Sequence, residues 1–187
     1  MPTGAAPTDR LSLPTPGVWE IDPAHSAVEF VARHMMVTKV RGRFAEVSGK
    51  IEIAEDPTKS SIEVDIDMAS LSTGSADRDG HLVSADFFDV ENHPTMRFAS
   101  TSIAPAGDQW QVTGDLTIRD VTKPVTLDLE YFGQVQDPWG TTKAQFSLTG
   151  EVEREAWGLT WNVPLEGGGF LVSKKVTIEV EVQIKPA

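Results

Sequence analysis

The residues best suited to acid–base chemistry are the four histidines, His25, His34, His81 and His93. None of them forms a close pair at the helical or strand spacing of a metal site such as HExxH. His34 ends the alternating run "AVEFVARH" on its apolar side, in register with Phe30. A histidine at such a position is either a core residue bonded to a backbone carbonyl or a polar contact at the bottom or mouth of a ligand cavity.

A second candidate for chemistry is the segment "IDPAHS", in which Asp22, His25 and Ser26 are the three residue types of a hydrolase triad. Ser26 directly follows His25, so on a strand the two side chains point to opposite faces. The chain also contains no Gly-x-Ser-x-Gly nucleophile motif. A turn that Asp22 stabilises before Pro23 explains the same residues, and we expect that turn.

Carboxylates recur in pairs two residues apart, which places each pair on one face of a strand: Asp65 and Asp67, Glu151 and Glu153, Glu179 and Glu181. A solvated face is the default for such pairs, although the separation that glycoside hydrolysis requires is spatial and not sequential. The "GGG" of residues 167–169 lacks the Lys-Ser/Thr of a phosphate loop, and the absence of cysteine removes thiolate chemistry. We therefore predict no catalytic residue, no metal site and no cofactor.

The aromatic residues indicate a ligand site more strongly than the polar residues do. Four phenylalanines fall on the apolar side of predicted strands beside small residues: Phe30, Phe44, Phe98 and Phe146. Leu116 is a further predicted contact on the same side. Such a face can fill a core or line a tunnel. Phe87 and Phe88 lie between two aspartates in an irregular segment, and we expect them to close one end of a cavity while Asp86 and Asp89 face water.

Further apolar residues lie where an entrance to that cavity is expected. Met35 and Met36 directly follow the strand that ends at His34, and flexible methionines suit a pliable entrance. Trp157 and Trp161 lie near the glycine-rich loop and are placed to cover an opening.

The elements that must position these residues are β-strands, because period-two alternation dominates the chain after residue 16. Residues 1–16 read as a flexible tail, and residues 17–187 as one domain. Strands are predicted near 17–22, 27–34, 39–54, 60–67, 95–103, 109–119, 124–136, 141–154 and 176–184. The glycines within them, Gly42, Gly49, Gly114 and Gly150, suit bulges and curvature.

One short helix is expected, capped by Ser75 or Asp77 and running to about Ser84. Many strands with little helix leave a sandwich or a barrel, and long strands bent by glycines favour the barrel. The predicted fold is all-β, an antiparallel lipocalin-like β-barrel of about eight strands, a size that encloses one small ligand. A free edge near 39–54 predicts a possible homodimer.

The charge of the chain limits its partners. Lys and Arg number 16 and Asp and Glu 28, a net charge of −12. A nucleic-acid partner requires a basic footprint that is not visible, so no nucleic acid is expected, and docking on an anionic membrane is disfavoured unless a local basic patch exists. No apolar run approaches the roughly 20 residues of a membrane helix, so no stable insertion is expected. The N-terminus does not resemble a signal peptide, which predicts a cytoplasmic location.

Several ordered motifs resemble the YceI-like family. The opening "GVWEIDPAHSAVEFVARHMMVTKVRGRF" is similar to its Trp, Asp, His-Ser, Phe, His and Gly-x-Phe series. Similar, too, are the segments "SADRDGHLVSADFFDVENHPTMRFAS", "VTGDLTIRDVTKPVTL" and "REAWGLTWN". The resemblance covers about residues 17–185.

The resemblance implies a lipocalin-like barrel that encloses a long isoprenoid lipid, with a binding role and without known catalysis. We accordingly predict that the chain binds a polyisoprenoid or a prenyl-tailed quinone precursor, as a carrier, storage or stress-response protein. The predicted lipid contacts are Phe30, His34, Met35, Met36, Phe44, Phe87, Phe88, Phe98, Leu116, Phe146 and Trp161. The alternatives are a lipocalin-like enzyme that uses His34 with a carboxylate on a lipid substrate, and a barrel that its own side chains fill.

Overall fold

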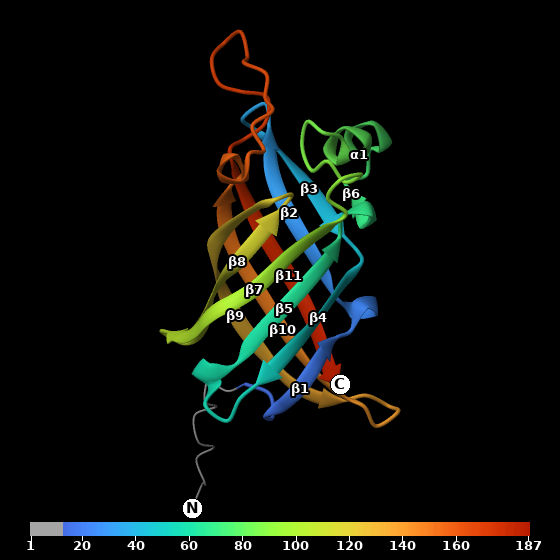
Figure 1. Cartoon of the computed structure of the whole chain (residues 1–187), viewed down its shortest axis with the longest axis vertical. Helices are drawn as coiled ribbons and strands as arrows, with labels where there is room; N and C mark the ends of the chain where they lie inside the picture. Colours follow the sequence, from blue (N-terminus) through green and yellow to red (C-terminus); the bar gives the residue numbers. More distant parts are fainter. Residues whose placement is uncertain (1–12) are drawn as a thin grey trace, which may run out of the picture.

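The alternating segments of the sequence form an antiparallel sheet of eleven strands in the computed structural model, which describes residues 13–187 (Figure 1). The strands are β1 (Gly17–Ile21), β2 (Ala27–His34), β3 (Thr38–Phe44), β4 (Val47–Ile53), β5 (Ser61–Asp67), β6 (Leu71–Ser72), β7 (Thr95–Ala106), β8 (Gln109–Ile118), β9 (Val121–Gln136), β10 (Thr142–Glu153) and β11 (Lys175–Pro186). The described α-helix is α1 (Ala76–Val83), and 3-10 turns cover Pro23–His25, Pro57–Lys59, Met68–Ser70 and Arg154–Trp157.

The sheet closes into a barrel because β1 pairs with both β4 and β11. The strand order is β1-β4-β5-β7-β8-β9-β10-β11-β2-β3-β6. β1 and β2 are two halves of one interrupted strand that runs along β11, and β3 and β4 are the halves of the next. Counted this way, eight strands surround the interior, which confirms the predicted fold class.

The segment 39–54 was expected to be one strand with a free edge, and this expectation is wrong. The strand breaks at Ala45 and Glu46, where it changes neighbours: Phe44 pairs with Leu71 of β6, whereas Val47 pairs with Ile66 of β5. β4 is paired on both sides. Within the described chain, the part of β3 with one neighbouring strand is 38–42.

Helix α1 and the chain that follows it lie beside the upper end of β3 in Figure 1. The Ser75 hydroxyl accepts a hydrogen bond from the backbone N–H of Arg78 (3.4 Å), as predicted for a capping residue. The Asp79 carboxylate binds the backbone and hydroxyl of Thr73, which anchors the helix to the end of β6. The segment 73–94 therefore covers the end of the barrel where β3 has its free edge.

Glycines in the strands make room for large side chains. A Cβ atom at Gly42 would lie 2.1 Å from Cζ of Phe30, and one at Gly114 would lie 2.4 Å from Cζ of Phe98. The phenylalanine rings thus lie flat over these glycines. The bulges predicted at Gly42, Gly49 and Gly150 are absent from the described ladders, whose register shifts occur near Thr101 of β7 and Phe132 of β9.

Residues 13–16 pack on the barrel, although they were assigned to the flexible tail. Leu13 contacts the core, and the carbonyl of Thr15 accepts a hydrogen bond from the indole of Trp19 (3.0 Å). The rest of the predicted tail, residues 1–12, lies outside the described residues. No helix in the described part of the chain is long and apolar enough to cross a bilayer.

Candidate functional site

A cavity runs through the interior of the barrel. Its volume, measured as the space open to the centre of a water molecule, is about 210 Å³. On this measure one water needs roughly 10–15 Å³, so the cavity has room for a chain of roughly 14–21 water-sized groups. The inward side chains do not fill the barrel, which argues against the alternative of a solid interior.

The cavity wall is apolar and is contributed by almost every strand. β2 and β11 form one side, where Val28 pairs with Val180 and Phe30 with Ile178. These four side chains point inward but are only half-buried, because they border the hollow. A nonpolar ligand would therefore find a continuous surface along this side.

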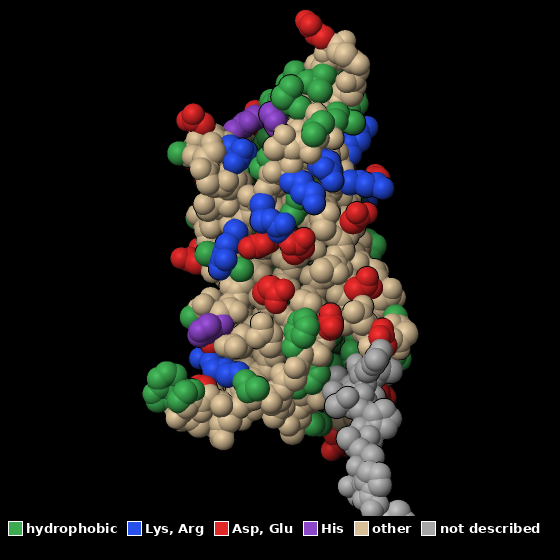
Figure 2. All heavy atoms as spheres, turned by 180° about the vertical axis from the view of Figure 1, so that it is seen from behind, with side chains coloured by type: hydrophobic (Ala, Val, Ile, Leu, Met, Phe, Trp, Pro, Cys, Tyr) green, Lys and Arg blue, Asp and Glu red, His purple; other side chains and the backbone are tan. Residues whose placement is uncertain are grey.

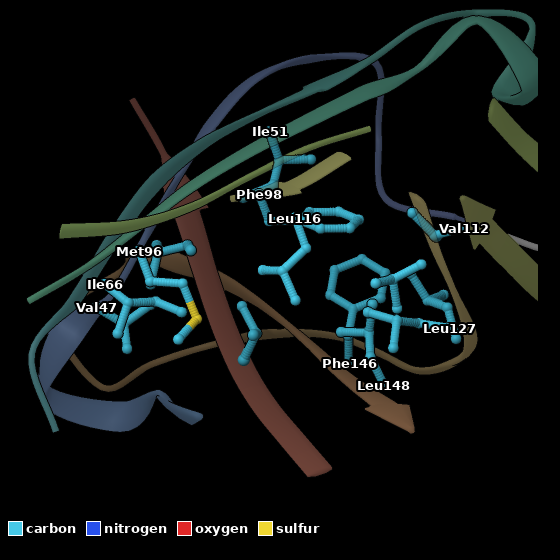
Figure 3. Close-up of a cluster of buried hydrophobic side chains, with 14 of the residues drawn as sticks. Val47, Ile51, Ile66, Met96, Phe98, Val112, Leu116, Leu127, Phe146 and Leu148 are labelled. Atoms are coloured by element: carbon cyan, nitrogen blue, oxygen red, sulfur yellow. The ribbon is translucent and has the colours of Figure 1, made fainter. Parts of the chain in front are cut away.

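The inward aromatic set predicted from the sequence lines this cavity. Phe30, Phe44, Phe98, Leu116 and Phe146 are all at its wall. Figure 3 shows Phe98, Leu116 and Phe146 converging on the interior from β7, β8 and β10. The rings of Phe30 and Phe44 lie 5.8 Å apart, so aromatic surface continues towards the end of the barrel that α1 covers.

Phe87 and Phe88 line the cavity from the segment after α1. Phe87 is 6% exposed, and its carbonyl accepts a hydrogen bond from the guanidinium of Arg119 (3.1 Å). Phe88 contacts Phe44 edge to face at 6.1 Å. Asp86 is exposed, whereas Asp89 is half-buried. Paired aromatics occur in this polar segment because it forms the cover of an apolar interior.

Trp161 does not line the cavity but packs behind Phe87, with ring centroids 5.4 Å apart. The guanidinium of the buried Arg154 lies 5.9 Å over the ring of Phe87 and donates to the carbonyl oxygens of Leu159, Trp161 and Ser173. Burial lowers the pKa of Arg154. These bonds fix the chain between β10 and β11 against the barrel end.

His34, Met35 and Met36 lie outside the cavity wall, and all three side chains are exposed. The interpretation of His34 as a core histidine is wrong, because it ends β2 three residues beyond Val31, the last residue of β2 that pairs with β11. The histidine–carboxylate pairs of the described chain are formed by the other three histidines, with Asp22, Asp86 and Asp89. The acid–base pair that an enzyme using His34 requires is not formed in the described residues.

Asp22 is a buried structural carboxylate. It accepts hydrogen bonds from Lys143 Nζ (2.7 Å) and from the N–H of Ala24 (3.2 Å), and His25 Nδ1 lies 2.9 Å away. The hydrogen bond from Lys143 is the main cause that lowers the pKa of Asp22 to about 2. The Ser26 hydroxyl bonds to the backbone of Gln183 instead. The predicted turn at Asp22 is confirmed, and the triad is not formed.

Sequence reasoning missed the aliphatic wall and Trp110. The alternation of β5 and β11 already indicates that Ile62, Val64, Ile178 and Val180 lie on inward faces, but the predicted ligand contacts include no β-branched residue. Trp110 is 4% exposed, lines the cavity, and its indole N–H has no partner among the described residues. No sequence signal distinguishes an unpaired indole from a paired one.

Comparison with known proteins places this barrel among solved structures. Burkholderia cenocepacia BcnA aligns with a TM-score of 0.73 at 25% identity, over 87% of this chain and 98% of that one. A Campylobacter jejuni YCEI protein aligns at 0.70 and 27% identity, over 83% and 90%. A polyisoprenoid binding domain from Saccharophagus degradans shares the fold, with a TM-score of 0.65 at 15% identity over 90% and 98%.

Sequence relatives agree with the structural ones. A UPF0312 protein of Serratia proteamaculans is 39% identical over 137 residues, which is 73% of this chain and 71% of the relative. Protein YceI of Escherichia coli O157:H7 is 38% identical over 130 residues, 69% and 68% of the two chains. The sequence model of the YceI-like domain matches residues 19–184, and the chain belongs to the YceI-like family.

Proposed function

We propose that the protein binds a long-chain isoprenoid lipid inside its barrel, without catalysis, as a carrier, storage or stress-response protein. The apolar cavity carries this proposal, because an elongated hydrocarbon needs a dry channel and few polar contacts. Each enclosed methylene contributes about 0.8 kcal/mol. Ten such groups would supply about 8 kcal/mol, before the cost of immobilising the chain.

One protein of the same fold, the Saccharophagus degradans domain, is described as polyisoprenoid binding. At 15% identity it lends only the fold, so the ligand class proposed here rests on the shape and chemistry of the cavity. The proposed contacts with the lipid chain are Phe30, Phe44, Phe87, Phe88, Phe98, Leu116 and Phe146. We assign His34, Met35, Met36 and Trp161 to the entrance.

A neutral head group suits the described wall better than a diphosphate does. Burying a diphosphate requires cations with free donors, and the buried Arg154 already donates to carbonyl oxygens through Nε and both terminal nitrogens. Trp110 offers an N–H without a partner in the described chain. The indole nitrogen is buried, so a carbonyl oxygen, as in a prenyl-tailed quinone or its precursor, would accept that hydrogen bond after the side chain turns towards the cavity that it lines.

Mass spectrometry of a solvent extract of the purified protein tests the proposal, together with uptake of an added prenyl quinone followed by tryptophan fluorescence. Two variants at neighbouring positions of β11 form a matched pair. Val180 lines the cavity and Glu181 is exposed on the outer face. Val180→Phe should lower quinone uptake at least tenfold, whereas Glu181→Phe should not. A folded wild-type protein that neither contains nor takes up isoprenoid would refute the proposal.

The homodimer and the cytoplasmic location stay predictions. The free edge of β3, 38–42, is a described strand segment at which a second copy could pair. Light scattering coupled to gel filtration measures the oligomeric state directly.

A further inference from the structure

Two segments at the α1 end of the barrel form a joint surface, here called the apical platform: the turn His34–Val37 and the hairpin 162–172. The N–H of Met35 donates to the carbonyl of Leu171 (2.8 Å), and His34 forms a β-bridge with Val172. Large hydrophobic side chains are exposed on both segments: Met35 (53%), Met36 (58%), Val37 (74%), Val163 (43%) and Phe170 (42%).

The turn holds its methionines in an unfavourable backbone conformation. Met35 and Met36 have φ values of 51° and 66°, and the N–H of Val37 bonds to the carbonyl of His34 across them. This left-handed geometry favours Asn-Gly, because a Cβ atom is crowded there. Two exposed methionines stabilise neither the turn nor the core. Their position is explained if a partner outside the protein covers them.

Cations surround the base of the platform. On the outer face, Lys39 of β3 lies opposite Arg33 of β2, and Lys175 of β11 lies two residues beyond the last pair of the β2–β11 ladder. All three residues are exposed, and none forms an ion pair within residues 13–187. Lys174 lies 5.4 Å over the ring of Phe170 and forms an ion pair with Glu155 (3.7 Å). The acid nearest to this row in the ladder is Glu153, opposite Lys175.

The charge changes sign further along the same strands. Arg41, in the next row of outward side chains, is bound by Glu29 (3.3 Å) and Glu179 (2.5 Å). Figure 2 shows the molecule from behind: an acidic side chain lies at the extreme upper tip, hydrophobic side chains lie below it, Lys and Arg follow, and further acidic side chains lie lower down. Among the outward cations on β2, β3 and β11, those without a carboxylate partner in the described chain are therefore the ones next to the exposed hydrophobic residues: Arg33, Lys39 and Lys175.

We propose that the apical platform docks the protein on the surface of an anionic lipid bilayer. Apolar side chains enter the boundary between head groups and acyl chains, and the cations beneath them face the anionic head groups. The hairpin also contributes Val172 to the cavity wall, so the docked surface adjoins the site proposed for the lipid. Docking through this surface does not require a ligand in the cavity.

The net charge of −12 does not prevent this docking at physiological salt. There the Debye length is about 8 Å, whereas a strand of 12 residues such as β11 spans about 40 Å at ~3.3 Å per residue. The acids of the lower barrel are screened from the membrane, and at the platform the cations Arg33, Lys39 and Lys175 outnumber Glu166, the exposed acid of the hairpin. α1 carries Asp77 and Asp79, so the barrel docks with the platform side, and not the helix side, towards the lipid.

Co-sedimentation of the full chain with vesicles at physiological salt tests the proposal. One set of vesicles is pure phosphatidylcholine, and the other contains equal parts of phosphatidylcholine and phosphatidylglycerol. The protein should bind the anionic vesicles and not the neutral ones. Each Lys near an anionic surface contributes about fivefold to binding, so Lys39→Gln/Lys175→Gln should weaken binding about 30-fold. The matched control, Lys50→Gln/Lys59→Gln at the other end of the barrel, should not weaken it.

The variant Met35→Asn/Met36→Gly separates docking from folding. It should bind anionic vesicles at least tenfold more weakly, yet keep or raise the Tm, because Asn and Gly suit the left-handed turn. Trp139→Ser, which removes the 87% exposed tryptophan of the β9–β10 turn, is the control for lost hydrophobic surface. Its binding should be unchanged.

Failure of the wild-type chain to bind anionic vesicles would overturn the docking proposal, and so would equal losses in the platform and control variants. Uptake of a prenyl quinone delivered in cyclodextrin is measured alongside, without any membrane. Loss of uptake with intact vesicle binding would instead overturn the proposed cavity function, so the two failures are distinguishable.

Discussion

The ion pair between Asp22 and Lys143 is predicted to be a main stabiliser of the barrel corner, and Asp22→Asn tests it. The pair joins the β1–β2 corner to β10, with side-chain exposures of 10% for Asp22 and 14% for Lys143. Replacing the carboxylate by an amide removes the negative charge and leaves Lys143 buried without its counter-ion. The shape of residue 22 hardly changes, so the effect reports charge.

The expected loss follows from the pKa of Asp22. Hydrogen bonding by Lys143 lowers it from 3.8 to about 2. One pKa unit corresponds to about 1.4 kcal/mol, so the ionised Asp22 contributes about 2 kcal/mol to the free energy of unfolding at pH 7. Removing one partner of a buried pair can cost up to about 5 kcal/mol. We expect a loss of about 2–4 kcal/mol.

The pH dependence of stability provides an independent test of whether the ionised carboxylate of Asp22 stabilises the folded protein. A carboxyl group whose pKa is lowered on folding stabilises the protein above the unfolded value of 3.8, and this stabilisation is lost as the pH falls towards about 2. The wild-type protein should therefore lose stability between about pH 4 and pH 2. Asp22→Asn should lose about 2 kcal/mol less over the same interval.

Urea unfolding followed by tryptophan fluorescence measures both effects. Asp115→Asn changes an exposed carboxylate on the outer face of β8 and serves as the control, with no expected change. The double variant Asp22→Asn/Lys143→Met should recover part of the stability, because it also removes the unpaired cation. A stability of Asp22→Asn equal to that of the wild type at pH 7 would refute this account of the pair.

Three further substitutions test the helix, the strand glycines and the cavity. Gly80→Ala should raise the free energy of unfolding by about 0.5–1 kcal/mol in urea titrations, because Gly80 lies in α1 with nothing near its Cβ position. Gly114→Ala should lower it by about 1–3 kcal/mol, since the new Cβ would lie 2.6 Å from the carbonyl oxygen of Ala99. Trp110→Phe should weaken binding of a prenyl quinone about tenfold but not that of the oxygen-free hydrocarbon squalene. Isothermal titration measures this difference, and equal losses for both ligands would contradict a hydrogen bond.

The fold was predictable because strand alternation is a local property of the sequence. The runs at 27–34 and 176–184 fix which side chains face inward whatever their neighbours are. The break in the strand at Ala45 was not predictable, since it arises from a change of partner between β6 and β5, two segments that are distant from it in the sequence and adjacent to it in the barrel. Alternation continues through 39–54 although the hydrogen-bonded neighbours change.

In the candidate site, too, the features that depend on local alternation were predictable, and those that depend on neighbouring strands were not. Inward orientation was enough to predict Phe30, Phe98 and Phe146 at the cavity wall. His34 shares their periodicity but projects beyond the barrel end, because strand length relative to the neighbouring strands decides where a cavity stops. The positions of the charged residues also depend on the neighbouring strands. The net charge of the chain argued against docking on an anionic membrane, whereas the register of three adjacent strands decides where Arg33, Lys39 and Lys175 lie.

Why the barrel is hollow is a question of where its rings lie. An eight-stranded barrel is just wide enough for side chains to fill it, so large rings directed at the axis would leave no channel. Here Phe30 lies over Gly42, its partner across the β2–β3 ladder, and Phe98 lies over Gly114. Each ring occupies space along the wall that a side chain on the neighbouring, hydrogen-bonded strand would otherwise take. Pairing a phenylalanine with a glycine thus makes the wall aromatic and keeps the axis open, and it gives the alternation of large and small residues in these strands a physical purpose.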